Sequence, residues 1–174
     1  MKFVSDIRLL LLGLWLGSAV FFIAVAQSAF AVLPELEMAG LVVNRTLSIL
    51  NIGGLIIAAS LMLTSWFVRR DANRLLVWSE RFLLLVVAAA CAVGQFVIGL
   101  WLSMVRTQIG RPIDDVPVDD PLRIQFNNLH EYSTWMLFAA MIAALLAFFI
   151  ISNRRFGQKP VIGTDFDFQK DLKV

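Results

Sequence analysis

The sequence has little of the chemistry that soluble enzymes use. It contains one cysteine and one histidine among its 174 residues, so a disulfide within the chain is excluded. Cys91 falls inside an apolar run, where a lone thiol is typical of a small core residue. The sequence has no C-x-x-C, H-E-x-x-H, Walker A or G-x-S-x-G pattern. We therefore predict that the protein is not an enzyme.

Charge is also scarce, because 16% of the residues are charged and 59% are hydrophobic. A soluble domain has about a quarter of its residues charged, so the bilayer is the expected solvent. Four apolar runs cover residues 7–33, 47–68, 82–105 and 132–152. Each reaches the length of about 20 residues that a helix needs to cross a membrane. Because a chain in lipid must satisfy its own backbone hydrogen bonds, we expect four helices.

The predicted fold class is all-α integral membrane, with four transmembrane helices in an antiparallel bundle. The helices are expected at about residues 7–33, 45–69, 80–105 and 127–153. The first run is longer than the apolar part of a signal peptide, which has about 7 to 15 residues, so we expect a retained helix. The bundle forms one domain over residues 1–153, and a polar cytoplasmic tail follows over residues 154–174.

Basic residues are distributed unevenly between the two sides of this bundle. Eleven of the fifteen Lys and Arg residues lie before or at the start of the first helix, between the second and third, or after the fourth. The other four, Arg45, Arg106, Arg111 and Arg123, lie on the opposite side. The positive-inside rule then predicts that both termini lie in the cytoplasm. The same bias accounts for the net charge of +2, so no nucleic-acid partner is expected.

The long outer connection between the third and fourth helices is acidic and rich in proline. It holds three of the five prolines and four aspartates, Asp114, Asp115, Asp119 and Asp120. Proline prevents a continuous helix, so an ordered or semi-ordered loop is expected. Clustered carboxylates can bind a hard cation, but the spacing lacks the central glycine and terminal glutamate of an EF-hand. No metal site is predicted, and a solvated acidic loop is preferred over cation binding.

Polar residues inside the apolar runs are few, and the middle of each run has no Asp, Glu, Lys or Arg. Proton relays and ion carriers usually need ionisable groups at that depth, so a lone pump is disfavoured. Three amides remain, Gln27, Asn51 and Gln95. One interpretation is that they form interhelical hydrogen bonds, each contributing about 0.6 kcal/mol. The other is that they line a small polar site.

The only histidine, His130, stands where the acidic loop meets the fourth apolar run. Four residues recur there at i, i+3, i+4 and i+7 and share a face if the helix begins near residue 126: Phe126, Leu129, His130 and Ser133. Asn127 or Asn128 is the expected N-cap. This position predicts that any ligand of the histidine lies in the outer leaflet.

An imidazole at this place has two interpretations. It can be a cofactor ligand, because chlorophyll magnesium needs one axial ligand and haem iron can take one histidine with a second ligand such as Met104 or Met136. It can instead anchor the outer loop by hydrogen bonding to Asp119, Asp120 or Glu131. The cofactor is therefore unknown, with chlorophyll or haem as the possibilities.

Three segments resemble the signatures of a known family: "GSAVFFIAVAQSAFAVLP" (17–34), "AGLVVNR" (39–45) and "FNNLHEYS" (126–133). The resemblance is to the domain-of-unknown-function 4149 family of small bacterial four-helix membrane proteins, which are related to the eukaryotic transmembrane protein 205. The residues that carry it are Gly17, Phe22, Ala26, Phe30, Ala39, Gly40, Arg45, Phe126, Leu129, His130 and Ser133. It implies the same four-helix architecture and a loose link to metal resistance.

Three functions fit these features. The preferred one is a non-catalytic structural or accessory subunit that packs against partner membrane proteins or a second copy of itself. The first alternative is a tetrapyrrole-binding subunit of a photosynthetic or electron-transfer complex, with His130 as the axial ligand. The second alternative is a small transporter or metal-tolerance protein, which the resemblance suggests.

Overall fold

The structure is a computed structural model that describes residues 2–66 and 74–156. Its elements in chain order are α1 (Lys2–Val32), α2 (Leu36–Ser65), α3 (Arg74–Ala92), the π-helix η1 (Val93–Ile98), α4 (Gly99–Ile109), the short 3-10 helix η2 (Ile113–Asp115) and α5 (Pro121–Phe156). The described residues contain no strand, and four helices formed by them are long and apolar enough to cross a membrane. The prediction of an all-α protein with four such helices is confirmed.

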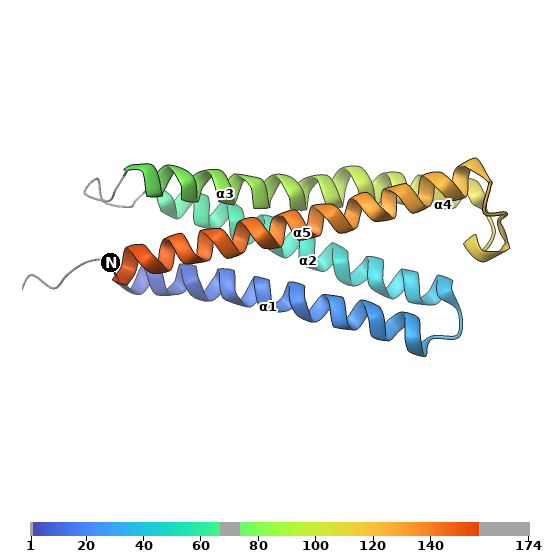
Figure 1. Ribbon diagram of the computed structural model, residues 1–174, viewed down its shortest axis with the longest axis horizontal. Coiled ribbons are helices and arrows are strands. Elements are labelled where there is room, and N and C mark those ends of the chain that lie inside the picture. The colour runs from blue at the N-terminus through green and yellow to red at the C-terminus, as the bar shows by residue number, and fades with distance from the viewer. Residues whose placement is uncertain (1, 67–73, 157–174) are drawn as a thin grey trace, which may run out of the picture.

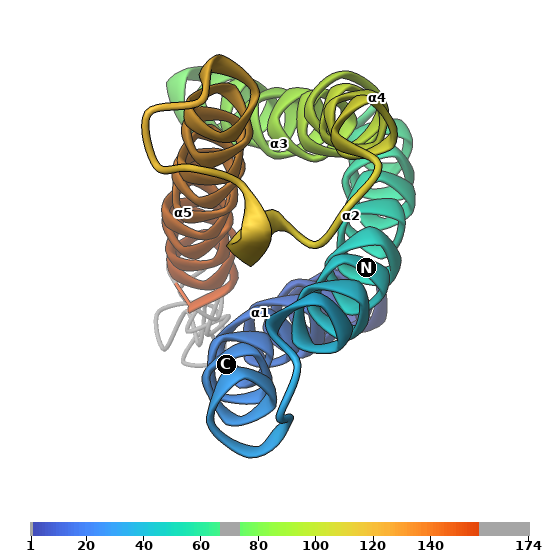
Figure 2. The ribbon, with the colours of Figure 1, turned by 90° about the vertical axis from the view of Figure 1, so that its right-hand side faces the viewer.

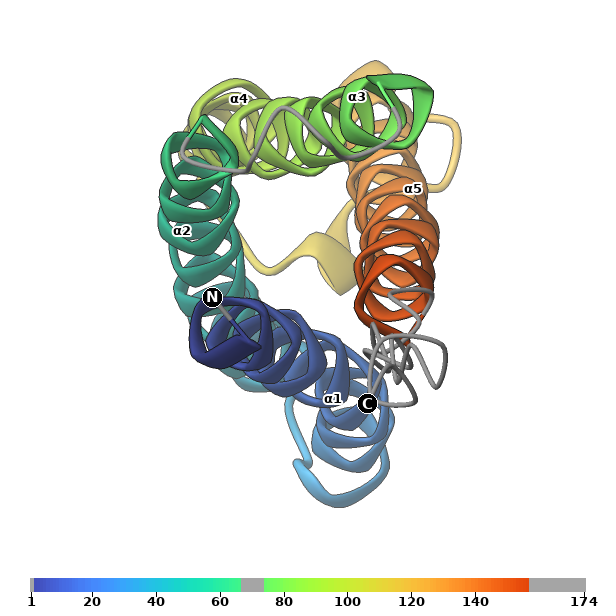
Figure 3. The same cartoon turned by 90° about the vertical axis from the view of Figure 1, so that its left-hand side faces the viewer.

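The four long helices lie side by side in alternating directions, with α3, η1 and α4 forming one continuous helix (Figure 1). Viewed along their length, they occupy the sides of a square in which α1 and α3 each contact α2 and α5 (Figure 3). The start of α1 and the end of α5 lie together, at what we call the terminal end. The α1–α2 and α4–α5 connections lie at the opposite end, which we call the loop end.

All four long helices begin earlier than the sequence predicts. The second starts at Leu36 instead of about 45, so only residues 33–35 separate it from the first. The fourth starts at Pro121 instead of about 127, because the carboxylate of Asp120 accepts a hydrogen bond from the Leu122 backbone N–H at 2.8 Å. Aspartate at the N-cap and proline at the first helical position are a favourable pair. Neither predicted asparagine is the cap.

The remaining bounds differ by a few residues. The first helix begins at Lys2 and the second ends at Ser65, whereas the third runs from Arg74 to Ile109. Gly110 ends it with a φ of +64°, a left-handed conformation that glycine adopts without strain. The fourth helix continues to Phe156, three residues into the predicted tail. Residues 157–174 of that tail lie outside the described residues.

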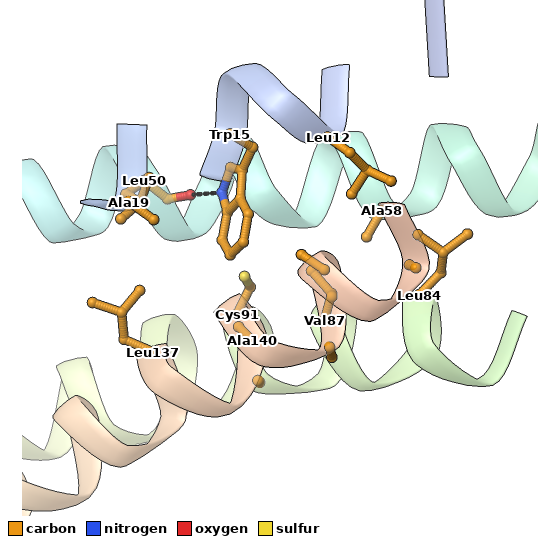
Figure 4. Close-up of a cluster of buried hydrophobic side chains, with 14 of the residues drawn as sticks. Leu12, Trp15, Ala19, Leu50, Ala58, Leu84, Val87, Cys91, Leu137 and Ala140 are labelled. Atoms are coloured by element: carbon orange, nitrogen blue, oxygen red, sulfur yellow. Dashed lines mark hydrogen bonds between the residues drawn. The ribbon is translucent and has the colours of Figure 1, made fainter. Parts of the chain in front are cut away.

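The core of the bundle centres on Trp15, whose indole is 3% exposed and whose Nε1 donates to the Leu50 carbonyl at 3.0 Å (Figure 4). Gly54 makes this packing possible. A Cβ added there would lie 2.6 Å from Trp15 Nε1 and 2.7 Å from Cys91 Sγ. Cys91 is therefore a buried core residue, as predicted. The alanines of α5, such as Ala140 and Ala144, let this helix approach the same core.

We predict that Gly54→Ala lowers the free energy of unfolding by about 1–3 kcal/mol, because a methyl group there must displace a ring and a sulfur. Gly53→Ala is the matched control, since nothing lies within 4 Å of its added Cβ. Helix propensity favours alanine at both positions, so the control should be unchanged or more stable. Reversible unfolding in mixed micelles measures both. Equal stabilities for the two variants would contradict the packing around Trp15.

A buried ion pair joins α1 to α3 near the terminal end. Arg8 is one of the eleven basic residues that the sequence places on the terminal side, but its side chain is 4% exposed and forms a salt bridge with Glu80, which is 0% exposed. Arg8 also donates to the Leu61 carbonyl at 3.0 Å, so it connects three helices. The next residue of α3, Arg81, donates through its guanidinium to Ser65 of α2. The described residues therefore include a buried charge pair that the sequence did not reveal, because composition does not show whether a charge near a helix end faces water or the bundle interior.

We expect Glu80→Gln to lower the free energy of unfolding by about 3–5 kcal/mol, since it leaves the Arg8 charge buried without its counter-ion. Combining Arg8→Met with Glu80→Leu should recover most of the loss, because apolar side chains then replace both partners of the pair. Glu131→Gln, on the exposed surface of α5, is the control and should be neutral. The same micelle unfolding assay applies. A double variant that is less stable than the single one would contradict this account.

Candidate functional site: a polar cavity at the loop end

A cavity of about 480 Å³ lies inside the loop-end half of the bundle. Its walls come from α2, from η1 and α4, from the start of α5, and from the loop before α5. The polar residues that line it are Glu37, Asn44, Ser48, Asn51, Gln95, Ser103, Arg106, Arg111, Asp114, Asn127, His130 and Ser133. Polar side chains in a membrane protein usually face the bundle interior or a water-filled cavity, so this gathering marks a candidate binding site.

The deep end of the cavity is formed by two amides, Asn51 of α2 and Gln95 of η1. Asn51 is 6% exposed and lies against Gly94, where an added Cβ would be 3.2 Å from Asn51 Nδ2. Gly94 and Gln95 belong to the π-helical turn, which fits one more residue into a turn than an α-helix does. Such turns are frequent at functional sites, because they change which side chains face the interior.

The outer end of the cavity is bordered by charged residues. Arg106 of α4 forms an ion pair with Glu37 of α2, with 2.5 Å between Nη2 and Oε1. Arg111 and Asp114 come from the loop, which crosses the loop end of the bundle (Figure 2). Buried Val116 holds this loop in place, because its carbonyl accepts a hydrogen bond from the Arg123 guanidinium. The acidic loop is therefore ordered, and it covers the outer end of the cavity.

His130 lies on the cavity wall with an exposed side chain. The two carboxylates nearest in sequence are engaged elsewhere. Asp120 caps α5, and Glu131 accepts a hydrogen bond from Trp135 Nε1 at 3.4 Å. Among the described residues, no hydrogen bond involves the imidazole. The anchoring of the loop by this histidine therefore stays a prediction.

The residues predicted to share a face of the last helix divide between two environments. Phe126, His130 and Ser133 line the cavity, whereas Leu129 packs with Ile98 and Val105 in a small apolar cluster between α4 and α5. The helix turns 100° per residue, so residues spaced by three or four form a wide stripe on its surface. One edge of that stripe can face the cavity while the other packs against α4.

The three amides singled out in the sequence also separate. Asn51 and Gln95 meet in the cavity, but Gln27 is exposed on α1 and does not line it. No interhelical hydrogen bond of these amides occurs within residues 2–66 and 74–156. The polar-site interpretation therefore stays a prediction for Asn51 and Gln95, and Gln27 lies outside that cavity.

Several cavity residues were not predicted, although the sequence carries a signal for them. On α2 the polar residues Glu37, Asn44, Ser48 and Asn51 follow one another at seven, four and three residues. On η1 and α4, Gln95, Gly99, Ser103 and Arg106 follow at four, four and three. These are helical spacings, so each set forms a polar stripe on one face.

Metal ligands are not grouped at this site. The described residues contain no cluster of three or more His, Cys, Asp or Glu side chains that could hold a metal ion. In the loop, Asp114 borders the cavity and Asp120 caps α5. The structure therefore gives no support to cation binding by the four loop aspartates.

We predict that the cavity is hydrated. In a Cys91→Ala background, Ser48→Cys on the cavity wall should react with a water-soluble methanethiosulfonate reagent in proteoliposomes. Ser60→Cys is the matched control on the same helix, because Ser60 is exposed on the outside of the bundle and does not line the cavity. It should stay unlabelled, since lipid excludes the charged reagent. Equal labelling of the two positions would contradict a water-filled cavity.

The comparisons with known proteins identify the family. A family model described as "Domain of unknown function (DUF4149)" matches residues 10–111, which is more than half of the chain. No curated protein and no solved structure matches. The matched range includes Gly17, exposed Arg45, buried Ala39 and the cavity residue Gly40, and it ends before α5. The similarity of α5 and the relation to transmembrane protein 205 stay predictions. The chain belongs to the DUF4149 family, whose function is unknown.

Proposed function

We propose that this protein binds a small polar ligand within the membrane, in the cavity at its loop end. The observation that carries the proposal is the convergence of polar side chains from three spans on one hollow of about 480 Å³. That volume lies within the range of about 300–1,000 Å³ that is typical of small-molecule sites. A four-helix membrane protein that only packed against partners would not need such a hollow.

The energetics of the deep amides support binding. A buried amide without a hydrogen-bond partner costs about 1–3 kcal/mol by mutational estimates. Asn51 is 6% exposed and lines the same hollow as Gln95, on the facing helix. Water molecules that hydrogen bond to the amides offset part of this cost. A ligand that hydrogen bonds to both amides also offsets it, and the two bonds fix the orientation of the ligand. Selectivity for a hydrogen-bonding ligand follows, because an apolar ligand would leave the amides without partners.

This site bears on the three functions considered from the sequence. It favours the small-transporter alternative, of which ligand binding is the first step, and we propose no catalytic role. A tetrapyrrole is less suited to this cavity, because its flat ring needs an apolar slot and the cavity side of His130 is lined by asparagines, serines and charged residues. The accessory-subunit function rests on the lipid-exposed apolar surface alone, and such a surface is expected of every membrane span.

We also propose that the loop end faces outward and the terminal end faces the cytoplasm of a bacterium. The support is the distribution of basic residues, eleven of fifteen of which belong to the terminal side in the sequence. The cavity then opens in the outer half of the inner membrane. Its expected partners are the bilayer and its ligand, with self-association or partner subunits as further possibilities.

The test is retention of ligand by variants of the deep amides. The protein is purified in mild detergent from its native membrane, and the small molecules it retains are extracted and identified by mass spectrometry. We expect Asn51→Leu and Gln95→Leu to lose the retained compound, because each removes a buried hydrogen-bonding group. Gln27→Leu is the matched control, since this amide is exposed outside the cavity, and it should retain the compound.

Two results would overturn the proposal. One is that the wild-type protein and the Gln27→Leu control retain the same compounds as both cavity variants. The other is a Soret or chlorophyll absorption band in the purified protein that disappears in His130→Ala, which would establish the tetrapyrrole alternative.

A further inference from the structure

The wall of the cavity is thin on the side of α1. At the terminal end α1 and α5 are neighbours, and Gly13 of α1 lies opposite Phe148 of α5. Towards the loop end the two helices diverge (Figure 1), and α1 stays beside α2. Phe30 is the one residue of α1 that lines the cavity among the described residues. The cavity is therefore closed towards the bilayer by little more than this ring.

The first turns of α5 border both the polar cavity and a second hollow on the outside of the bundle. Asn127 and His130 line the polar cavity, and they also line a shallow groove that continues along α5. Trp135, Phe138 and Ile142 form the apolar part of the groove. All three are exposed, and Ile142 is 59% exposed. A ligand with its polar part in the cavity can therefore place an apolar part in the groove, against lipid.

Access from the water side is more restricted. The loop residues Ile113 and Asp114 cover the outer end of the cavity, and the Arg123–Val116 hydrogen bond holds the loop. The Glu37–Arg106 ion pair joins the two helices on the side away from α1. The least obstructed route for a ligand into the cavity therefore runs from the bilayer between α1 and α5.

The charges in the cavity cancel. Glu37 and Asp114 are acidic, and Arg106 and Arg111 are basic. A ligand with a net charge would meet a like charge in the cavity as well as an opposite one, and the like-charge contact weakens its binding. A zwitterionic ligand avoids that cost, because its anionic part can meet an arginine while its cationic part meets a carboxylate.

We propose that the ligand is a phospholipid with a zwitterionic headgroup, which enters from the bilayer between α1 and α5. The headgroup occupies the polar cavity, and one acyl chain lies in the groove of α5. This inference rests on the proposed function, because it assigns a chemical class and a route to the ligand of the same cavity.

The experiment is a lipid titration read by native mass spectrometry of the detergent-solubilised protein. Phosphatidylethanolamine and phosphatidylglycerol are the two probes, and the bound fraction is measured for each. We expect phosphatidylethanolamine to bind more tightly, and Arg111→Glu to weaken it by about fivefold through loss of a partly exposed ion pair. Phe30→Trp should weaken both lipids, because a larger ring narrows the opening. Phe21→Trp is the matched control on α1, since Phe21 is exposed away from the cavity.

The outcomes separate this inference from the proposed function. Equal binding of the two lipids overturns the zwitterionic headgroup. Lipid binding that is insensitive to Phe30→Trp and Gln95→Leu overturns the site, because the lipid then sits on the outer surface. If no lipid binds but a polar compound is retained by Gln27→Leu and lost in Gln95→Leu, the lipid inference fails and the proposed function stands. If neither lipid nor compound is retained, both fail.

Discussion

The packing of the Trp15 indole against Gly54 is the contact on which the rest of the structure depends. The ring fills the middle of the bundle, and its N–H is satisfied by the Leu50 carbonyl, so no polar group is left exposed to the apolar core. Asn51 and Gly94, one turn away on the loop side, already belong to the polar cavity. The indole therefore separates the polar cavity from the terminal half of the bundle, and the absence of a Cβ at Gly54 permits this packing.

Charged residues reinforce this division at both ends. At the terminal end, Arg8 and Glu80 are buried together, where a charge pair keeps its strength because little water screens it. At the loop end, Glu37 and Arg106 form a half-exposed pair that joins α2 to α4 beside the cavity. The first pair ties α1 into the bundle, and the second does not involve α1. This asymmetry is consistent with the path of α1, which packs closely with α5 at the terminal end and diverges from it at the loop end. The divergence leaves the side of the cavity where Phe30 and His130 lie.

The positions of the individual polar residues show how far sequence reasoning reaches. Apolar length predicted four helices correctly, because a chain in lipid has few other ways to satisfy its backbone. The helix starts were less accurate, since Asp120 and Glu35 each precede a helix that begins outside the apolar run. The sequence left two interpretations for Gln27, Asn51 and Gln95, interhelical hydrogen bonds or a shared polar site, and the structure places only Asn51 and Gln95 in one cavity. The three amides look alike in sequence, and only the rotation of each helix decides which of them faces inward.

The sequence by itself therefore determined that the chain crosses the membrane as four helices, because hydrophobic length and backbone hydrogen bonding leave no alternative. It also determined that polar residues on α2 and α4 lie in stripes, because helical periodicity is fixed by geometry. Only the tertiary structure decided that these stripes face each other, that His130 joins them and that the acidic loop covers them. It also decided that Arg8 and Glu80 are paired, 72 residues apart in the chain. The reason is that such contacts depend on helix rotation and on close packing at Gly54, which arise between helices and not within any one of them.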